Sequence, residues 1–488
     1  MKRAVGLIAL LATSCTTMEP TYVRPGPAIP SSWPVGDPYL RAAEAPLPAV
    51  RYTDIFRDPR LQTLIAQALV NNRDLMVAAA NIAAAREQYR IQRASQFPTL
   101  DANAGATLSG NRSGGGGSSS SGGSGSSSGG NGGNSGSGIH ANYNLGLSVP
   151  SFELDLFGRL RSLTHVELEH YFATEAGARA TRLTLVGDVA SAWLTHASDE
   201  SLLKIAEQTA ASAQKSVELT RLRLNGGIAP RTDLSQAEQI LDQAQADLAR
   251  QRTAVAQDVN ALQLLVGAPI APDLLAGSID EAFGTVVALP AGVDSYVLLR
   301  RPDVLQSEYE LRAANAQIGA ARAALFPRIT LTGLLGFASS ALTSLFTGGA
   351  FGASAGVNAG YTIFQAGAGH ANVRLTEAQK AAALATYQHT IQTAFREVAD
   401  ALARRGTLND ELSARQRQKE AAADTYLLTE ARYRAGIDPF LTVLDAQRSY
   451  YSAQQTLVQM KLTAAQNLVD LYQSLGGDSL LEPPPAKP

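Results

Sequence analysis

An internal repeat is the feature that most constrains this chain. Asp74 and Asp303 each begin an Ala-rich run that ends in a Phe-Pro pair, and the two runs lie 229 positions apart. Gly158 and Gly367 each begin a longer helical pattern, and these glycines lie 209 positions apart. Landmarks that recur in the same order indicate two copies of one structural unit in a single chain.

The offset between the copies changes where the sequence has low complexity. Residues 110–138 are almost wholly Gly, Ser and Asn, and the interval that holds them accounts for the difference. Because such a composition cannot bury a core, we expect a flexible loop inside the first copy. The predicted division is a signal peptide at 1–14, an extended N-terminal strap at 15–57, a first repeat at 58–268, a linking segment at 269–291, a second repeat at 292–474 and a C-terminal tail at 475–488.

The N-terminus resembles a bacterial export signal. Lys2 and Arg3 precede the apolar run Ala4–Ala12, which is too short to cross a membrane as a helix. Small residues then lead into Cys15, the single cysteine, as in a lipobox, so we expect cleavage before Cys15 and lipidation of this residue. The alternative is ordinary signal cleavage nearby, with Cys15 incidental. No later run of 18 apolar residues occurs, so no transmembrane helix is expected.

Alternation of apolar with small or polar residues predicts two strands in each copy. The clearest are at Leu145–Val149 and Ile329–Leu331, with weaker partners at Ala102–Leu108 and Val357–Phe364. Four strands cannot close a barrel, and open strand edges are not tolerated in lipid. If these strands lie in a membrane, subunits must therefore share one barrel.

Apolar residues at intervals of seven predict a helix packed along a seam at the end of each copy. These residues are Leu234, Leu241, Leu248, Val255 and Leu262, and, 209 positions later, Val443, Tyr450, Leu457, Ala464 and Leu471. A longer helix is expected before each seam. In the first copy it runs from about Gly158 to Leu224, on the order of 100 Å.

The turns between these helices are predicted to be hairpin tips. Gly227 and Gly436 suit the position just after a helix, while Pro230 and Pro439 suit the first position of the next one. Asp438 is a candidate N-cap of the final helix.

Five motifs carry a family resemblance. They are FELDLFGR at 152–159, RPDV at 301–304, ALFP at 324–327, YRAG at 433–436 and LTVLDAQRS at 441–449. Together they resemble the TolC/OprM family of outer-membrane factors. More closely, the chain resembles the NodT-like lipoprotein branch allied with resistance-nodulation-division (RND) pumps.

The resemblance implies a mainly α, TolC-like fold in which three chains share a 12-stranded transmembrane β-barrel and a long α-helical barrel. It implies a passive outer-membrane exit duct for small toxic compounds in a tripartite efflux system. The implied partners are sister chains in a homotrimer, a periplasmic adaptor, an inner-membrane RND-type transporter and outer-membrane lipid. The implied location is the bacterial outer membrane, with a lipid anchor and an extension into the periplasm.

The resemblance also assigns roles near the second tip. Asp445 matches the family's innermost aspartate and Leu441 an apolar ring, so both are expected at a pore constriction. Thr442 stands where some relatives carry a second aspartate. Alternatively, Asp445 merely favours a helix N-terminus electrostatically. The tips, marked by Gly227, Pro230, Gly436 and Pro439, are expected to contact the adaptor.

Three further residues receive interpretations. Arg432 and Arg434 precede the second tip and are candidates to hold gate contacts by pairing with acidic groups. The alternative is that they are solvated cations at a helix C-terminus. Trp193 is interpreted as a packing residue rather than part of a ligand site.

Composition and motifs argue against an enzyme. The formal net charge of −2 gives no electrostatic reason to expect a nucleic-acid partner. The His residues are scattered and no P-loop motif occurs, so no catalytic residue, cofactor or metal is expected. Two alternatives to an efflux channel stay open. One is the outer-membrane channel of a type I protein secretion system, and the other is a trimeric coiled-coil structural lipoprotein without a channel.

Overall fold

The computed structural model describes residues 17–27, 29–30, 32–34, 51–110, 139–287 and 295–477. The predicted signal peptide, Cys15, residues 35–50 of the predicted strap, the Gly/Ser-rich residues 111–138 and the end of the predicted tail lie outside the described residues. The chain divides into two compact units. A strand unit is built around segments 88–166 and 315–378, and a helix unit contains most of the remainder.

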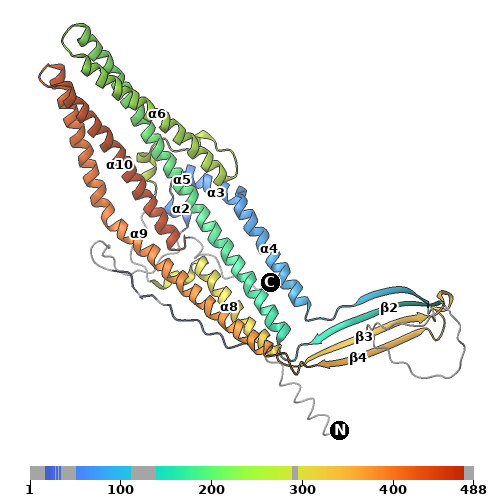
Figure 1. The fold of residues 1–488 in the computed structure, drawn as a ribbon. Helices are drawn as coiled ribbons and strands as arrows, with labels where there is room; N and C mark the ends of the chain where they lie inside the picture. The colour runs from blue at the N-terminus through green and yellow to red at the C-terminus, as the bar shows by residue number, and fades with distance from the viewer. Residues whose placement is uncertain are drawn as a thin grey trace. The chain divides into compact units, whose positions relative to one another are not determined.

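The repeat predicted from the sequence is confirmed by the order of the elements (Figure 1). In chain order these are α2 (Tyr52–Ile55), α3 (Pro59–Asn71), α4 (Arg73–Ala94), β1 (Asp101–Gly110), β2 (Ile139–Leu154), α5 (Arg159–Asn225), α6 (Arg231–Val266), α7 (Ile279–Phe283), α8 (Pro302–Ala323), β3 (Arg328–Ser339), β4 (Phe351–Gly360), α9 (Ala368–Arg434) and α10 (Phe440–Ser474). The succession of helix, strand pair, long helix, tight turn and helix therefore occurs twice, from α4 to α6 and from α8 to α10.

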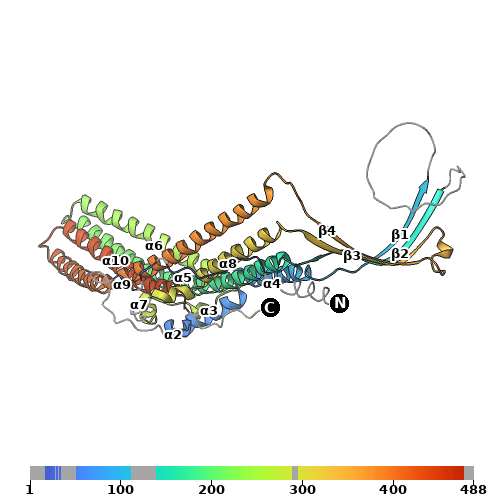
Figure 2. The same cartoon turned by 90° about the horizontal axis from the view of Figure 1, so that it is seen from below.

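The four strands form one antiparallel sheet in the order β1-β2-β3-β4 (Figure 2). Strands that follow each other in the chain are neighbours in the sheet, so each pairing is local in the repeat or joins the two repeats through β2 and β3. The β2–β3 register shifts between Val149 and Phe152. Pro150 lies inside this shift, and because proline has no N–H to give to the ladder, it explains the irregularity.

The predicted position of the fourth strand, Val357–Phe364, is wrong. The strand is Phe351–Gly360, and its ladder with β3 ends at the pair Arg328 and Gly360. Ile363 and Phe364 lie beyond it and are 91% and 85% exposed. Because β4 consists largely of Gly, Ala and Ser, it has little alternation, and the apolar residues past its end drew the prediction toward them.

The long helices dominate the helix unit. α5 and α9 each contain 67 residues, which corresponds to roughly 100 Å at the rise of an α-helix. Neither contains a proline, and both are rich in Ala, Leu, Glu and Arg, residues that favour helix. Among the described residues, no helix is both long and apolar enough to cross a lipid bilayer.

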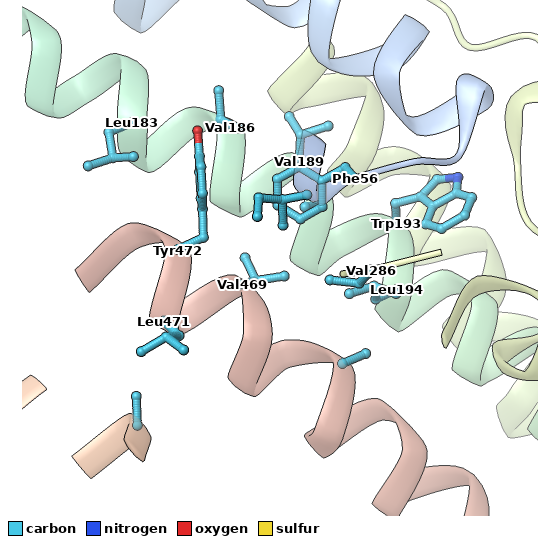
Figure 3. Packing of buried hydrophobic residues seen from close by; sticks show 14 of the residues in the cluster. Phe56, Leu183, Val186, Val189, Trp193, Leu194, Val286, Val469, Leu471 and Tyr472 are labelled. Atoms are coloured by element: carbon cyan, nitrogen blue, oxygen red, sulfur yellow. The ribbon is translucent and has the colours of Figure 1, made fainter. Parts of the chain in front are cut away.

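The main core of the helix unit lies where α5, α10 and the short elements around α2 and α7 meet (Figure 3). Phe56, Val189, Leu194 and Val469 are fully buried there. Trp193 is also fully buried, and its indole Nε1 donates to the carbonyl of Leu274 at 3.0 Å. The interpretation of Trp193 as a packing residue is therefore confirmed.

The seven-residue seam is more deeply buried in the second copy than in the first. In α10, Val443, Leu457 and Leu471 are all buried, whereas in α6 only Leu262 of the predicted seam is fully buried in this single chain. Leu234 of α6 is half-buried. Within this single chain, the predicted seam of the second copy is therefore more completely covered than that of the first.

Candidate functional site at the hairpin tips

The first tip is a helix stop of the Schellman type. Gly227 has φ of +71°, in the left-handed region that favours glycine. Its N–H donates to the carbonyl of Leu224 at 3.0 Å, and the N–H of Ile228 donates to the carbonyl of Arg223 at 2.9 Å. Two carbonyls that the end of α5 leaves free are satisfied in this way, so the chain reverses within a few residues before α6 begins.

The second tip repeats this geometry. Gly436 has φ of +76°, its N–H donates to Tyr433 at 2.9 Å, and the N–H of Ile437 donates to Arg432 at 2.9 Å. The prediction that both glycines lie just after a helix is confirmed. The same sequence pattern, 209 positions apart, thus folds into the same turn twice.

The predicted helix starts need correction. Pro230 and Pro439 are the N-cap residues of α6 and α10 and not their first helical residues, so each helix begins one residue later than predicted. Their extended backbone lies outside the helix, and their missing N–H is one that no helix would use there. Asp438 is therefore not the N-cap, since Pro439 occupies that position and no side chain caps α10.

Asp438 instead closes the tip. Its carboxylate accepts from Arg432 Nε at 2.7 Å and from Nη2 at 2.9 Å, a two-point contact across the turn. These bonds from Arg432 lower the pKa of Asp438 below its ordinary value. Arg434 pairs with Glu430, one helical turn earlier, at 2.6 Å. In this chain both arginines thus have acidic partners on their own hairpin.

A cross-hairpin contact joins the two tips. The guanidinium of Arg223, from α5, lies 4.5 Å from the ring centroid of Tyr433, from α9. Arg223 Nη1 also donates to the carbonyl of Tyr433 at 3.2 Å. A cation over an aromatic face together with a hydrogen bond to a carbonyl fixes one hairpin against the other.

An apolar cluster supports this contact. Tyr433 is 5% exposed and packs on Phe440 with ring centroids 5.2 Å apart, and Val217 of α5 belongs to the same buried cluster. Further along, Ser212 and Tyr426 hydroxyls lie 3.2 Å apart. The Arg223–Tyr433 contact was missed from the sequence, although the match between Arg223 and Arg432 in the repeat could have drawn attention to it.

The two predicted constriction residues share the exposed face of α10. Leu441 is 54% exposed and Asp445 lies one turn further along the helix, also exposed. Val443 and Leu444, between them, face the buried cluster. Asp445 has no ion-pair partner among the described residues. The structure therefore presents an apolar and an acidic side chain together on a face that this chain leaves uncovered.

This arrangement favours conduction or docking over chemistry. Within the part of the chain that the structure describes, no group of three or more His, Cys, Asp or Glu could hold a metal ion. The outer membrane efflux protein family model matches residues 64–268 and 295–477, which include both repeats and both tips.

The chain belongs to the outer membrane efflux protein family. A curated relative, the solvent efflux pump outer membrane protein SrpC of Pseudomonas putida, is 41% identical over 97% of this chain and 98% of the relative. The cation efflux system protein CusC of Escherichia coli is 36% identical over 96% of this chain and 98% of the relative. Members of the outer membrane efflux protein family are channels and not enzymes. The predictions of an efflux channel and of a protein without enzymatic activity are therefore confirmed.

Solved structures confirm the TolC-like fold. The open state of the Neisseria gonorrhoeae MtrE outer membrane channel has a TM-score of 0.82 and 34% identity, covering 95% of this chain and 98% of that chain. A CusC structure has a TM-score of 0.78 and 35% identity, covering 95% of this chain and all of that chain. The chain is thus an outer-membrane component of an efflux pump of the outer membrane efflux protein family.

Proposed function

We propose that the chain is a passive exit duct that acts as a homotrimer and receives small toxic compounds from an inner-membrane RND-type transporter through a periplasmic adaptor. Relatives named for pumps of solvents, antibiotics and cations support this class of cargo. The observation that carries the proposal is the pairing of two tightly turned hairpins with an uncovered face of α10 that bears Leu441 and Asp445.

Asp445 and Leu441 are the proposed constriction. In a trimer, three copies of Asp445 would form a ring of carboxylates that favours cations, and three copies of Leu441 would form an apolar ring that resists wetting. The exposure of both side chains in the single chain leaves them free to meet their copies.

The hairpin tips are the proposed adaptor contacts. The two sharp turns are formed at Gly227 and Pro230 and at Gly436 and Pro439. Each turn also contains an exposed isoleucine: Ile228 is 70% exposed and Ile437 is 62% exposed. Equivalent apolar residues at two equivalent tips offer an adaptor the same kind of contact at both positions. Arg432 and Arg434 are the proposed gate-pairing residues. Their present acidic partners lie on the same hairpin and would move with it, so a gate contact would pair either arginine with an acidic group of another hairpin.

Single-channel recording in planar bilayers tests the proposal. The trimer is expected to conduct, and Asp445→Asn is expected to lower its preference for cations, while Leu441→Ala raises conductance by widening the apolar ring. Asp424→Asn removes the same charge from an exposed position on α9 and serves as the matched control. Absence of conductance in all variants would favour a structural lipoprotein.

Two further experiments address the finer assignments. Lipid labelling of the exported protein is expected to disappear in Cys15→Ser, and retained labelling would refute the anchor. Copurification from membranes is expected to bring down an adaptor and an RND-type transporter. Recovery of a transporter that exports proteins would instead support a type I secretion channel.

A further inference from the structure

A cavity of about 640 Å³ lies in the helix unit, away from both tips. Its walls come from α5, the start of α8, α9 and α10. Acidic side chains converge on it from all four helices: Asp188, Asp303, Glu397, Asp400 and Asp470. Its volume falls within the range of about 300 to 1,000 Å³ that is typical of small-molecule sites.

The cations that line this cavity already have anionic partners. Arg301 pairs with Asp303 at 2.7 Å and with Glu397 at 2.9 Å, and it donates to the carbonyl of Ser474 at 2.8 Å. Arg404 pairs with Glu411 at 2.9 Å. These bonds hold both guanidinium groups in place and leave them with little capacity to neutralise other acids.

Three lining carboxylates therefore remain without a cationic partner among the described residues. They are Asp188, Asp400 and Asp470, one each from α5, α9 and α10. Burial raises the pKa of Asp188 and of Asp470, since a carboxylate loses solvation there. All three side chains keep exposed surface in this chain, so a cation in the cavity can reach them, and its charge would offset their partial loss of solvation.

A buried acceptor lies among these carboxylates. Asn467 of α10 lines the cavity and is only 5% exposed. Its Nδ2 donates to the carbonyl of Ala401 at 3.0 Å, which fixes the amide, while its Oδ1 has no hydrogen-bond partner. A buried acceptor without a partner costs free energy, so a donor placed in the cavity would be stabilising.

The first repeat indicates that helix packing does not require an acid at the positions of Asp400 and Asp470. Ser191 stands 209 positions before Asp400, and Ala261 stands 209 positions before Asp470. The equivalent helices of the first repeat, α5 and α6, thus have neutral residues at the positions of Asp400 and Asp470. The other lining positions have acidic equivalents in the first repeat, since Asp74, Asp188 and Asp258 match Asp303, Glu397 and Asn467, so only the charges of Asp400 and Asp470 are particular to this cavity.

We propose that this cavity binds an organic cation with several ammonium groups, such as a linear oligoamine. Ammonium groups spaced along a flexible chain can meet carboxylates on separate helices, and one N–H can donate to Asn467 Oδ1. A directly ligated metal ion fits less well, because the described residues hold no cluster of three or more suitable ligands. Binding at this cavity does not require conduction, so a failure of the binding experiment would leave the proposed channel function untouched, and the reverse also holds.

Isothermal titration calorimetry with spermidine at low ionic strength tests the site in the purified full-length protein. We expect saturable binding of one spermidine per chain. The double variant Asp188→Asn, Asp470→Asn is expected to weaken binding at least about tenfold, as loss of ion pairs worth about 1.4 kcal/mol would do. Asp400→Asn, at an exposed position that folding tolerates, is expected to weaken it severalfold.

Two controls separate a built site from general negative charge. Asp424→Asn removes one charge from an exposed position of the same helix, α9, and is expected to leave the affinity unchanged. Asn467→Leu removes the unpartnered acceptor without changing the charge and is expected to weaken binding, with the fold checked by circular dichroism.

Several outcomes would overturn the proposal. An equal loss in Asp424→Asn would mean diffuse attraction, and an unchanged affinity in Asn467→Leu would place the amine elsewhere. Displacement of spermidine by Mg²⁺ at equal concentration would make the site one for hydrated divalent cations. Failure to observe saturable binding in the wild-type protein would refute an oligoamine site outright.

Discussion

Arg223 and Arg432 occupy equivalent positions in the two repeats, each four residues before the glycine that turns the chain, and yet they make different contacts. Arg432 closes its own tip on Asp438. In the first repeat Ala229 stands at the position of Asp438, so Arg223 has no such partner and lies over Tyr433 of the other hairpin. One side-chain difference therefore turns a symmetric repeat into an asymmetric contact, in which the first hairpin holds the second.

The same comparison applies nearer the core. Asp199 of α5 and Asp258 of α6 share a hydrogen bond, and burial together with the neighbouring Asp199 raises the pKa of Asp258 to about 7. The equivalent residues of the second repeat are Leu408 and Asn467. The first hairpin thus contains a titrating pair where the second contains none.

The largest expected effect is that of Tyr433→Ala. Loss of a buried aromatic side chain is expected to cost about 3 to 5 kcal/mol, and it also removes the surface on which Arg223 lies. The equivalent change in the first repeat, Leu224→Ala, should cost much less because Leu224 is only half-buried. Thermal denaturation followed by circular dichroism measures both.

Tyr433→Phe is the matched control for that change. The hydroxyl of Tyr433 is buried without a hydrogen-bond partner, so its removal is expected to leave the denaturation midpoint nearly unchanged. Equal destabilisation by the Phe and Ala variants would contradict the view that the aromatic ring of Tyr433, and not its hydroxyl, stabilises the fold.

Arg223→Ala should have the next largest effect. It removes a cation–π contact and a hydrogen bond, together worth about 1 to 3 kcal/mol, and should loosen the second hairpin. Trypsin cleavage within residues 425–440 is expected to become faster. Ala229→Asp, which restores the acid of the second tip, should reproduce part of this effect by drawing Arg223 back to its own hairpin. A cleavage rate identical to wild type in both variants would rule out a holding role.

Asp258→Asn should change stability in a pH-dependent way. Because the pKa of Asp258 is raised in the folded protein, the folded state keeps a proton that the unfolded state loses above about pH 4, so this group lowers stability progressively as pH rises to about 7. The variant is expected to match wild type at pH 4 and to be more stable at pH 8 by roughly 1 kcal/mol, discounted for solvent screening. Denaturation midpoints that differ equally at both pH values would exclude titration of this pair as the cause.

Arg432→Ala is expected to have the smallest effect on stability. Its pair with Asp438 is at the protein surface, where ion pairs contribute little and salt screens them. Any loss should vanish in 1 M salt or as pH falls through the lowered pKa of Asp438, below which the carboxylate is protonated. An effect of Arg432→Ala as large as that of Arg223→Ala would reverse the comparison between the two tips.

Much of the fold could be predicted because its signals are local or strictly periodic. Gly227 and Gly436 mark the turns, and apolar residues at intervals of seven mark α6 and α10. The end of β4 was misplaced because strand propensity is weak in a Gly- and Ala-rich segment whose ladder is set by its neighbour β3.

Less of the candidate site than of the fold could be predicted from the sequence. Asp438 looked like a cap because acids favour that position, but the proline that follows it took the N-cap and left the carboxylate free for Arg432. The Arg223–Tyr433 contact spans 210 positions and depends on how two hairpins pack, which no local pattern encodes. Leu441 and Asp445 were found by resemblance alone, and their place at a constriction stays a prediction.

The equal lengths of α5 and α9, 67 residues each, limit how proteins of this kind can change over evolutionary time. A deletion in one long helix would bring its tip out of step with the other and rotate every side chain below it by about 100° per residue lost. Only paired deletions of whole heptads, made in both hairpins and on both arms of each, would preserve the seams and keep the two tips level. Substitution is therefore expected to be common in these helices, while length should be nearly invariant.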